Sequence, residues 1–83
     1  MYSIIFSPTA ERQFRKLNNE TQRRISSFLD RIRIRPFSHD IKRLAGTRYY
    51  RARVGKYRLI LDIFQDKLII VIIEIGLRGK IYK

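Results

Sequence analysis

The sequence predicts an α+β domain in which an antiparallel pair of helices packs on one face of a twisted, mainly antiparallel sheet. Apolar residues recur at helical spacing in the first half of the chain and at strand spacing in the second half. A polar break over residues 35–40, which contains Pro36, separates the two halves. A chain of 83 residues can build one modest hydrophobic core. Residues 1–83 are therefore expected to form a single domain with the order strand, two helices and three further strands.

The N-terminal segment predicts a strand followed by a helix. Residues 2–6 are mostly aromatic or β-branched, and Ser7 and Pro8 stop them, which is typical of a short strand. A helix then begins at Pro8 or Thr9 and ends at the two asparagines of residues 18–19. Its apolar stripe consists of Ala10, Phe14 and Leu17.

The second helix has the clearest helical periodicity in the chain. Its apolar stripe consists of Ile25, Phe28, Leu29 and Ile32. Asn19 or Thr21 is expected to cap its first N–H groups. Arg31, Arg33 and Arg35 gather at its C-terminal end, where positive charge suits the helix dipole. The connection between the helices is very short, so they should form an antiparallel hairpin laid on the sheet.

A β-hairpin is predicted after Tyr49, with Gly55 and Lys56 as its loop. If Val54 opposes Tyr57 in this hairpin, the register places three arginines on one face of the sheet: Arg51, Arg53 and Arg58. Arg53 and Arg58 would then lie directly opposite each other, which destabilises a strand pair by about 0.2–1 kcal/mol. Such a conflict indicates that an anion binds to this face.

The last strand is predicted over residues 67–75, after a turn at Gln65 and Asp66. Its nearly unbroken Leu, Ile and Val residues are typical of a central strand that is buried on both faces. The direction of this strand returns the tail, residues 76–83, to the end of the sheet that holds Arg58. Arg78 and Tyr82 are therefore expected to join the arginine cluster.

The strongest compositional signal is the charge. The chain has 19 lysines and arginines against 7 aspartates and glutamates, a formal net charge of +12. Solubility alone needs a net charge of only about 2–8 on a small domain. The excess indicates a polyanionic partner, and RNA is the favoured one.

Other features favour the cytoplasm. The chain has no cysteine, so it contains neither a disulfide nor a thiolate metal site, and a small domain of this kind suits a reducing compartment. Its N-terminus lacks the basic and apolar regions of a signal peptide. The apolar run at residues 68–73 is far shorter than the ~20 residues of a membrane-spanning helix, so no membrane partner is expected.

The candidate chemistry is that of guanidinium, ammonium and phenol groups. The single histidine, His39, has no second histidine or cysteine with which to share a metal. The carboxylates Asp62, Asp66 and Glu74 have no paired spacing, and a glycine-rich phosphate loop is missing. No metal and no cofactor are therefore expected. Fixed cations would instead stabilise a phosphodiester that gains negative charge in its transition state, and RNA supplies its own 2′-OH nucleophile.

Three segments of the chain resemble RelE toxins. They are Lys42-Arg43-Leu44-Ala45-Gly46, the run from Tyr50 to Ile60, and Gly76-Leu77-Arg78 with Ile81-Tyr82. The resemblance spans nearly the whole chain, and the pattern Y-R-x-R-x-G-x-Y-R is fairly specific to the RelE/ParE superfamily. It implies the fold described above and a role as the toxin of a type II toxin–antitoxin system. RelE toxins enter the ribosomal A site and cut messenger RNA there without a metal ion, which inhibits translation.

The resemblance also implies roles for individual residues. The paired basic positions of the family fall on Arg51 and Arg53, its phosphate-holding arginine on Arg58, and its C-terminal arginine and tyrosine on Arg78 and Tyr82. These five residues are the candidate catalytic set. Further basic residues are candidates for RNA binding: Lys42, Arg43, Arg48, Lys56 and Lys80.

Two departures from the family pattern leave the proton-accepting group open. Several relatives carry lysine where Arg51 and Arg53 stand, and Leu77 occupies a position that is often histidine. The candidates for the proton-accepting group are Lys56, Lys80 and Tyr82. The tyrosine has a second possible role, since its ring could stack on an RNA base.

Two other functions stay open at this point. ParE-like toxins share the fold and poison DNA gyrase, but they generally lack the basic catalytic set and the C-terminal tyrosine. A non-catalytic RNA- or ribosome-binding module would need only the charge. The resemblance further implies a cognate, RelB-like antitoxin whose acidic residues neutralise the basic face in a heteromeric toxin–antitoxin complex.

Overall fold

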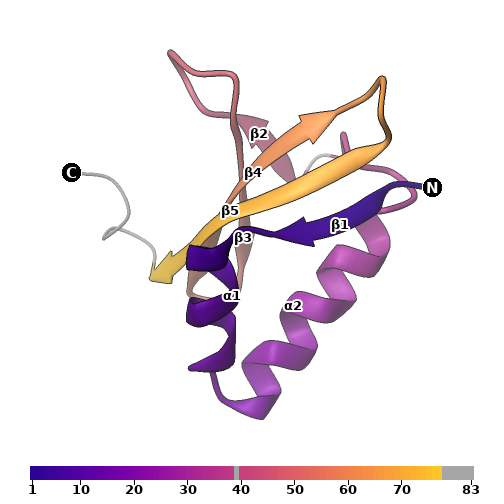
Figure 1. Ribbon diagram of the computed structural model, residues 1–83. Coiled ribbons are helices and arrows are strands. Elements are labelled where there is room, and N and C mark those ends of the chain that lie inside the picture. The colour runs from indigo at the N-terminus through magenta and orange to yellow at the C-terminus, as the bar shows by residue number, and fades with distance from the viewer. Residues whose placement is uncertain (39, 78–83) are drawn as a thin grey trace.

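The computed structural model describes residues 1–38 and 40–77, which form two helices and five strands (Figure 1). The helices are α1 (Pro8–Arg15) and α2 (Asn19–Ile32). The strands are β1 (Ser3–Phe6), β2 (Ile41–Arg43), β3 (Tyr50–Val54), β4 (Tyr57–Phe64) and β5 (Ile69–Leu77). The predicted order of elements is confirmed, with β2 as an additional strand ahead of the predicted hairpin.

The strands form one mixed sheet in the order β1-β5-β4-β3-β2. β1 runs parallel to β5, and the other neighbours are antiparallel. Both helices lie against the same face of this twisted sheet, and no described residue forms a helix on the opposite face (Figure 1). The predicted fold class is thereby confirmed. The sequence pattern does not reveal β2, because its three residues are too few to show an alternation.

Asparagine and serine side chains start the two helices. The Ser7 Oγ accepts a hydrogen bond from the Ala10 amide at 3.0 Å, which caps α1. The Asn18 Oδ1 accepts one from the Thr21 amide at 2.8 Å, which caps α2. The prediction of Asn19 or Thr21 as this cap is wrong, because Asn18 has the extended backbone of a capping residue and Asn19 already belongs to the helix.

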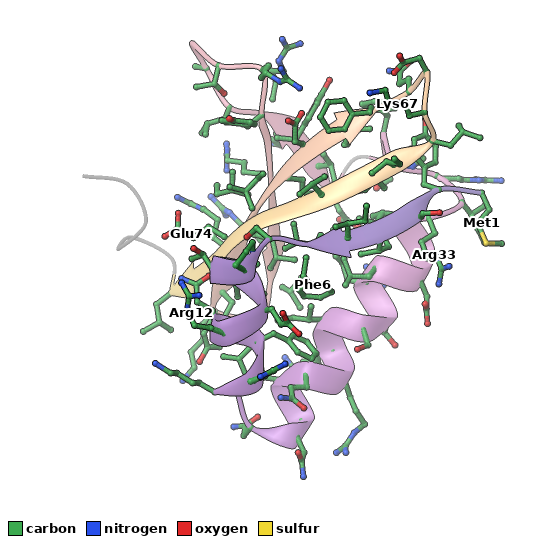
Figure 2. All side chains as sticks on the ribbon, viewed as in Figure 1. Met1, Phe6, Arg12, Arg33, Lys67 and Glu74 are labelled. Carbon is green, nitrogen blue, oxygen red and sulfur yellow. The ribbon has the colours of Figure 1, made fainter. Side chains whose placement is uncertain are left out.

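The hydrophobic core lies between the helices and the sheet. The largest fully buried side chains are Ile25, Ile32, Leu59, Leu61, Ile70 and Ile72. Phe6 points from β1 towards the helices (Figure 2) and meets the ring of Phe14 edge-on, with 5.4 Å between the ring centroids. The core is therefore one-sided: it lies between the sheet and the helices, and no helix in the described part of the chain covers the other face, where Ile60 and Asp62 are nevertheless buried.

β5 differs from its predicted role as a central strand buried on both faces. It lies one strand from the edge of the sheet, and burial along it follows positions such as Ile70 and Ile72, which face the helices. The central strand is β4, in which residues 59–62 are all buried. The prediction is wrong because β5 lies next to the short edge strand β1, with no described helix on its second face, so its apolar residues there are only half-buried.

The β3–β4 hairpin has the predicted register. Gly55 has a φ of +60°, which a glycine at the first position of a two-residue loop adopts without strain. Val54 then pairs with Tyr57, and Arg53 pairs with Arg58. The two arginines lie directly opposite each other on the face that the helices leave uncovered.

Replacing Arg53 with glutamine is expected to stabilise the domain by about 0.2–1 kcal/mol, because the change removes one of two directly opposed cations. Urea unfolding at low and high salt measures the effect, and the gain should shrink at high salt as the charges are screened. Arg12→Gln is the matched control, since it removes the same charge from the exposed surface of α1. An Arg53→Gln domain no more stable than the control would contradict the expectation.

Candidate nucleic-acid interface

The uncovered face of the sheet carries two rows of paired residues. Across β2, β3, β4 and β5, the first row consists of Lys42, Arg51, Ile60 and Glu74. Across β3, β4 and β5, the second row consists of Arg53, Arg58 and Gly76. Neighbouring strands lie about 4.8 Å apart, and successive residues on one face of a strand about 6.6 Å apart, so the four cations lie within about 12 Å of one another. We call Lys42, Arg51, Arg53 and Arg58 the basic face.

The basic face combines exposed and half-buried cations. Lys42 and Arg53 are exposed, whereas Arg51 and Arg58 are half-buried, and the Nε atom of Arg58 is fully buried. A cleft of about 190 Å³ is lined by Lys42, Arg51 and Arg53 together with Asp40. A guanidinium can donate two parallel hydrogen bonds to phosphate oxygens, and a half-buried one is less screened by salt than an exposed one. The arrangement therefore suits the binding of a phosphate group.

A β-bulge brings one carboxylate to the basic face. β4 and β5 pair Ile60 with Glu74 but Leu61 with Ile72, so β5 contains one extra residue at this point. Glu74 is half-buried and lies one strand and one row from Arg58, a separation that long side chains can span. The sequence alone predicts no catalytic role for Glu74, because no second carboxylate follows it at a paired spacing. Its place beside the arginines depends on the bulge, which has no sequence signal of its own here.

Two of the predicted RNA-binding residues point away from the basic face. Arg43 follows Lys42 along β2 and so lies on the other face, where its guanidinium is 5.5 Å from the centre of the Tyr50 ring. Its Nε donates a hydrogen bond to the Thr47 carbonyl at 3.2 Å. Lys56 is exposed in the hairpin loop and lines a cleft of about 250 Å³ with the start of α2.

Arg48 already has a carboxylate partner. Its Nη2 lies 3.0 Å from the Oδ2 of Asp62, and its Nε donates to the Oδ1 at 3.3 Å. The guanidinium also lies 5.1 Å from the centre of the Phe64 ring. Asp62 is 8% exposed, and a buried carboxylate needs such a partner. Asp62 lies four residues further along β4 than Arg58, about 13 Å away. Arg48 therefore pairs with a carboxylate at the other end of the strand and does not extend the basic face.

The C-terminal candidates Arg78, Lys80 and Tyr82 lie outside the described residues, as does His39. The end of β5 does return to the hairpin loop, since Leu77 pairs with Tyr57. The predicted direction of this strand is therefore confirmed.

The described residues show neither a cluster of metal-binding side chains nor a membrane-spanning helix. Over residues 1–38 and 40–77, no group of three histidine, cysteine, aspartate or glutamate side chains gathers as a metal site would need. In the same part of the chain, neither helix is long and apolar enough to cross a bilayer. The basic face can hold phosphates and stabilise additional negative charge on them.

Comparison with known proteins places the chain in a family. The family described as "ParE toxin of type II toxin-antitoxin system, parDE" matches residues 4–82. Comparison with curated proteins gives no match.

Several solved structures are similar to this chain. A chain of the RelE–RelB complex from Pyrococcus horikoshii is 27% identical, with 95% of this chain and 97% of that chain covered and a TM-score of 0.84. A chain of the RelBE2 toxin–antitoxin complex from Mycobacterium tuberculosis is 26% identical, with 93% and 98% covered and a TM-score of 0.80. The YoeB/ParE toxin from Agrobacterium tumefaciens is 12% identical, with 94% and 99% covered and a TM-score of 0.80, which shows a shared fold alone.

The family match and the solved structures agree with the resemblance of the sequence to the RelE/ParE superfamily. Because that match extends over nearly the whole chain, the protein belongs to the ParE toxin family of type II toxin–antitoxin systems, within the RelE/ParE superfamily.

Proposed function

We propose that this chain is a RelE-type endoribonuclease that cleaves messenger RNA in the ribosomal A site and so inhibits translation in the cytoplasm. The observation that carries the proposal is the basic face, where the β3–β4 register concentrates Arg51, Arg53 and Arg58. The similarity to two complexes that contain RelE supports it. The alternatives are a gyrase poison of the same family and a module that binds RNA or the ribosome without cutting.

The proposed reaction is a transesterification within the RNA. The ribose 2′-oxygen attacks the adjacent phosphorus, the bond from phosphorus to the 5′-oxygen of the next nucleotide breaks, and a 2′,3′-cyclic phosphate and a 5′-hydroxyl form. Negative charge grows on the non-bridging oxygens of the phosphate. Arg58 donates hydrogen bonds to these oxygens, and Arg51 and Arg53 lie near enough to add positive charge.

Two protons must move in this reaction, and arginine is a poor acceptor because it stays protonated. Glu74 is the one carboxylate in the two rows of the uncovered face, and it lies diagonally across the sheet from Arg58, on the neighbouring strand and one row away. We assign to Glu74 the acceptance of the 2′-OH proton. Arg78 and Tyr82 stay in the catalytic set that the family resemblance implies. We assign to the phenol of Tyr82 the donation of a proton to the leaving 5′-oxygen, and to Arg78 a further contact with the phosphate.

The proposed partner is a RelB-like antitoxin that binds across the helical hairpin. An apolar groove of about 610 Å³ lies between α1 and α2, and its lining includes Phe14, Ser26 and Leu29. Amphipathic helices dock into grooves of this kind through their apolar side chains. Acidic residues of the same partner would neutralise the net charge of +12.

Primer-extension mapping of a translated messenger RNA is expected to show cuts at codon positions only when ribosomes are present. Arg58→Ala should lower the cleavage rate by about 10²–10³-fold, because it removes the main donor to the charged phosphate. Arg12→Ala on α1 is the matched control and should cut like the parent protein. Absence of cuts with the parent protein would overturn the nuclease proposal, and DNA cleavage trapped with gyrase in the same extract would favour the ParE-type alternative.

Replacing Glu74 with glutamine is expected to slow single-turnover cleavage by about 10²–10⁴-fold, because the amide cannot accept the 2′-OH proton. The same change should leave the affinity for an uncleavable 2′-O-methylated RNA unchanged or improved, since it removes a negative charge beside the phosphate. Asp30→Asn, an exposed carboxylate change on α2, serves as the control. Parental cleavage rates in Glu74→Gln would return the base role to Tyr82 or to a lysine.

Coexpression of the tagged chain with its neighbouring gene is expected to yield a copurifying acidic protein. Ser26→Arg should reduce the amount captured, because it places a bulky charge in the apolar groove. Gln65→Arg adds the same charge to the exposed turn between β4 and β5 and should have no effect. Equal capture by all three chains would show that the partner does not bind in this groove.

A further inference from the structure

A second basic cleft lies between α2 and the β3–β4 hairpin. It has a volume of about 450 Å³, and four arginines line it: Arg23, Arg24, Arg31 and Arg53. Its single carboxylate is Glu20. β2 pairs only with residues 50–52 of β3, so this edge strand ends before the cleft begins. We call this site the α2 cleft.

The positive charge of the α2 cleft is poorly compensated. Arg24 lies 3.8 Å from Glu20, and Arg31 lies 3.7 Å from Asp40, but all four side chains are largely exposed, and such pairs contribute little. Within residues 1–38 and 40–77, no carboxylate forms an ion pair with Arg23. Like charges that line a concave surface raise the local potential and concentrate counter-ions there.

The lining of the α2 cleft fits a phosphate backbone better than a protein segment. A protein partner would need an exposed aromatic or aliphatic residue in the cleft to pack against. The apolar residues that line it are Phe28, which is 2% exposed, and Val54, which is 9% exposed, so both are already buried in the core. A polynucleotide backbone needs only cations and polar groups, which the cleft provides.

Arg53 connects the α2 cleft to the basic face. It lines the cleft of about 190 Å³ together with Lys42 and Arg51, and it also lines the α2 cleft. On the helix side, Arg23 and Arg31 are eight residues apart, a rise of about 12 Å along α2. One basic surface therefore continues from the basic face around the edge of β3 and along α2, and it is long enough to contact several successive phosphates.

We propose that the α2 cleft binds the phosphodiester backbone of RNA that flanks the phosphate held on the basic face. This inference rests on the proposed function for the identity of the polyanion. The cleft contributes affinity and orients the strand, and it contacts no reacting atom. Its arginines should act equally on all base sequences, because phosphate contacts carry no sequence information.

The first test measures the salt dependence of RNA binding by the purified toxin, freed from its antitoxin. Arg23→Gln with Arg24→Gln should weaken binding of a fluorescent 2′-O-methyl oligouridylate of about 12 nucleotides on the order of tenfold at physiological salt, and should lower the slope of log K against log salt by about 1.4. An oligomer of about 3 nucleotides, which only the basic face can hold, should lose less than about twofold. Arg12→Gln with Lys16→Gln removes the same charge from the exposed surface of α1 and the residue that follows it, and should match the parent protein.

A second variant tests the site without removing an arginine. Ser27 lies in the α2 cleft four residues from both Arg23 and Arg31, so the carboxylate of Ser27→Glu would pair with them along the helix. This variant should weaken binding of the longer RNA as the double arginine variant does. Gln65→Glu places the same charge in the exposed turn between β4 and β5 and should not.

The outcomes separate this inference from the proposed function. Loss of affinity for the longer RNA without cleavage at ribosomes would support the α2 cleft and overturn the nuclease. Cleavage at ribosomes, with both sets of α2 variants binding RNA like their controls, would overturn the inference alone. An equal loss of affinity for the short and the long RNA would also overturn the inference. So would a loss of antitoxin capture with unchanged RNA affinity, because that result would make the cleft a protein interface.

Discussion

The backbone of Gly55 is the constraint on which the arrangement of cations depends. Its positive φ lets the chain reverse between β3 and β4 in two residues, which pairs Val54 with Tyr57 and sets every later pair of the hairpin. A shift of one residue would move the arginines of β3 to the side that the helices cover. The loop glycine therefore decides which face of the sheet is basic, although it carries no side chain itself.

The opposed pair of Arg53 and Arg58 lowers the stability of the fold but favours anion binding at this face. Two guanidinium groups across a strand pair weaken the fold, whereas a bound phosphate turns both into ligands. Arg48 shows the contrasting case on the same sheet. It meets the buried Asp62 at 3.0 Å, so its charge is used within the protein and contributes to stability. The difference between the three arginines comes from their neighbours and not from residue type.

Both helices pack on one face of the sheet, which leaves the opposite face uncovered for the cations. α1 and α2 cover one face of the sheet and bury the apolar residues of β4 and β5, so the opposite face can hold charged side chains without burying them completely. The bulge opposite Ile60 and Leu61 keeps both Ile72 and Ile75 in the core while Glu74 turns to the basic face. One extra residue in β5 therefore allows the strand to fill the core and also to place a carboxylate on the basic face.

The helices, the hairpin and the cluster of Arg51, Arg53 and Arg58 could be predicted from the sequence alone, because these features depend on local rules: apolar spacing, a loop glycine and strand alternation. The roles of Arg78 and Tyr82 rest on family resemblance. The remaining features of the site could not be predicted from the sequence. The three residues of β2, the bulge that places Glu74, the pairing of Arg48 with Asp62 and the arginines gathered between α2 and β3 all depend on contacts between segments far apart in the chain. Such contacts follow from how the helices and the sheet pack together, and local sequence patterns do not contain that information.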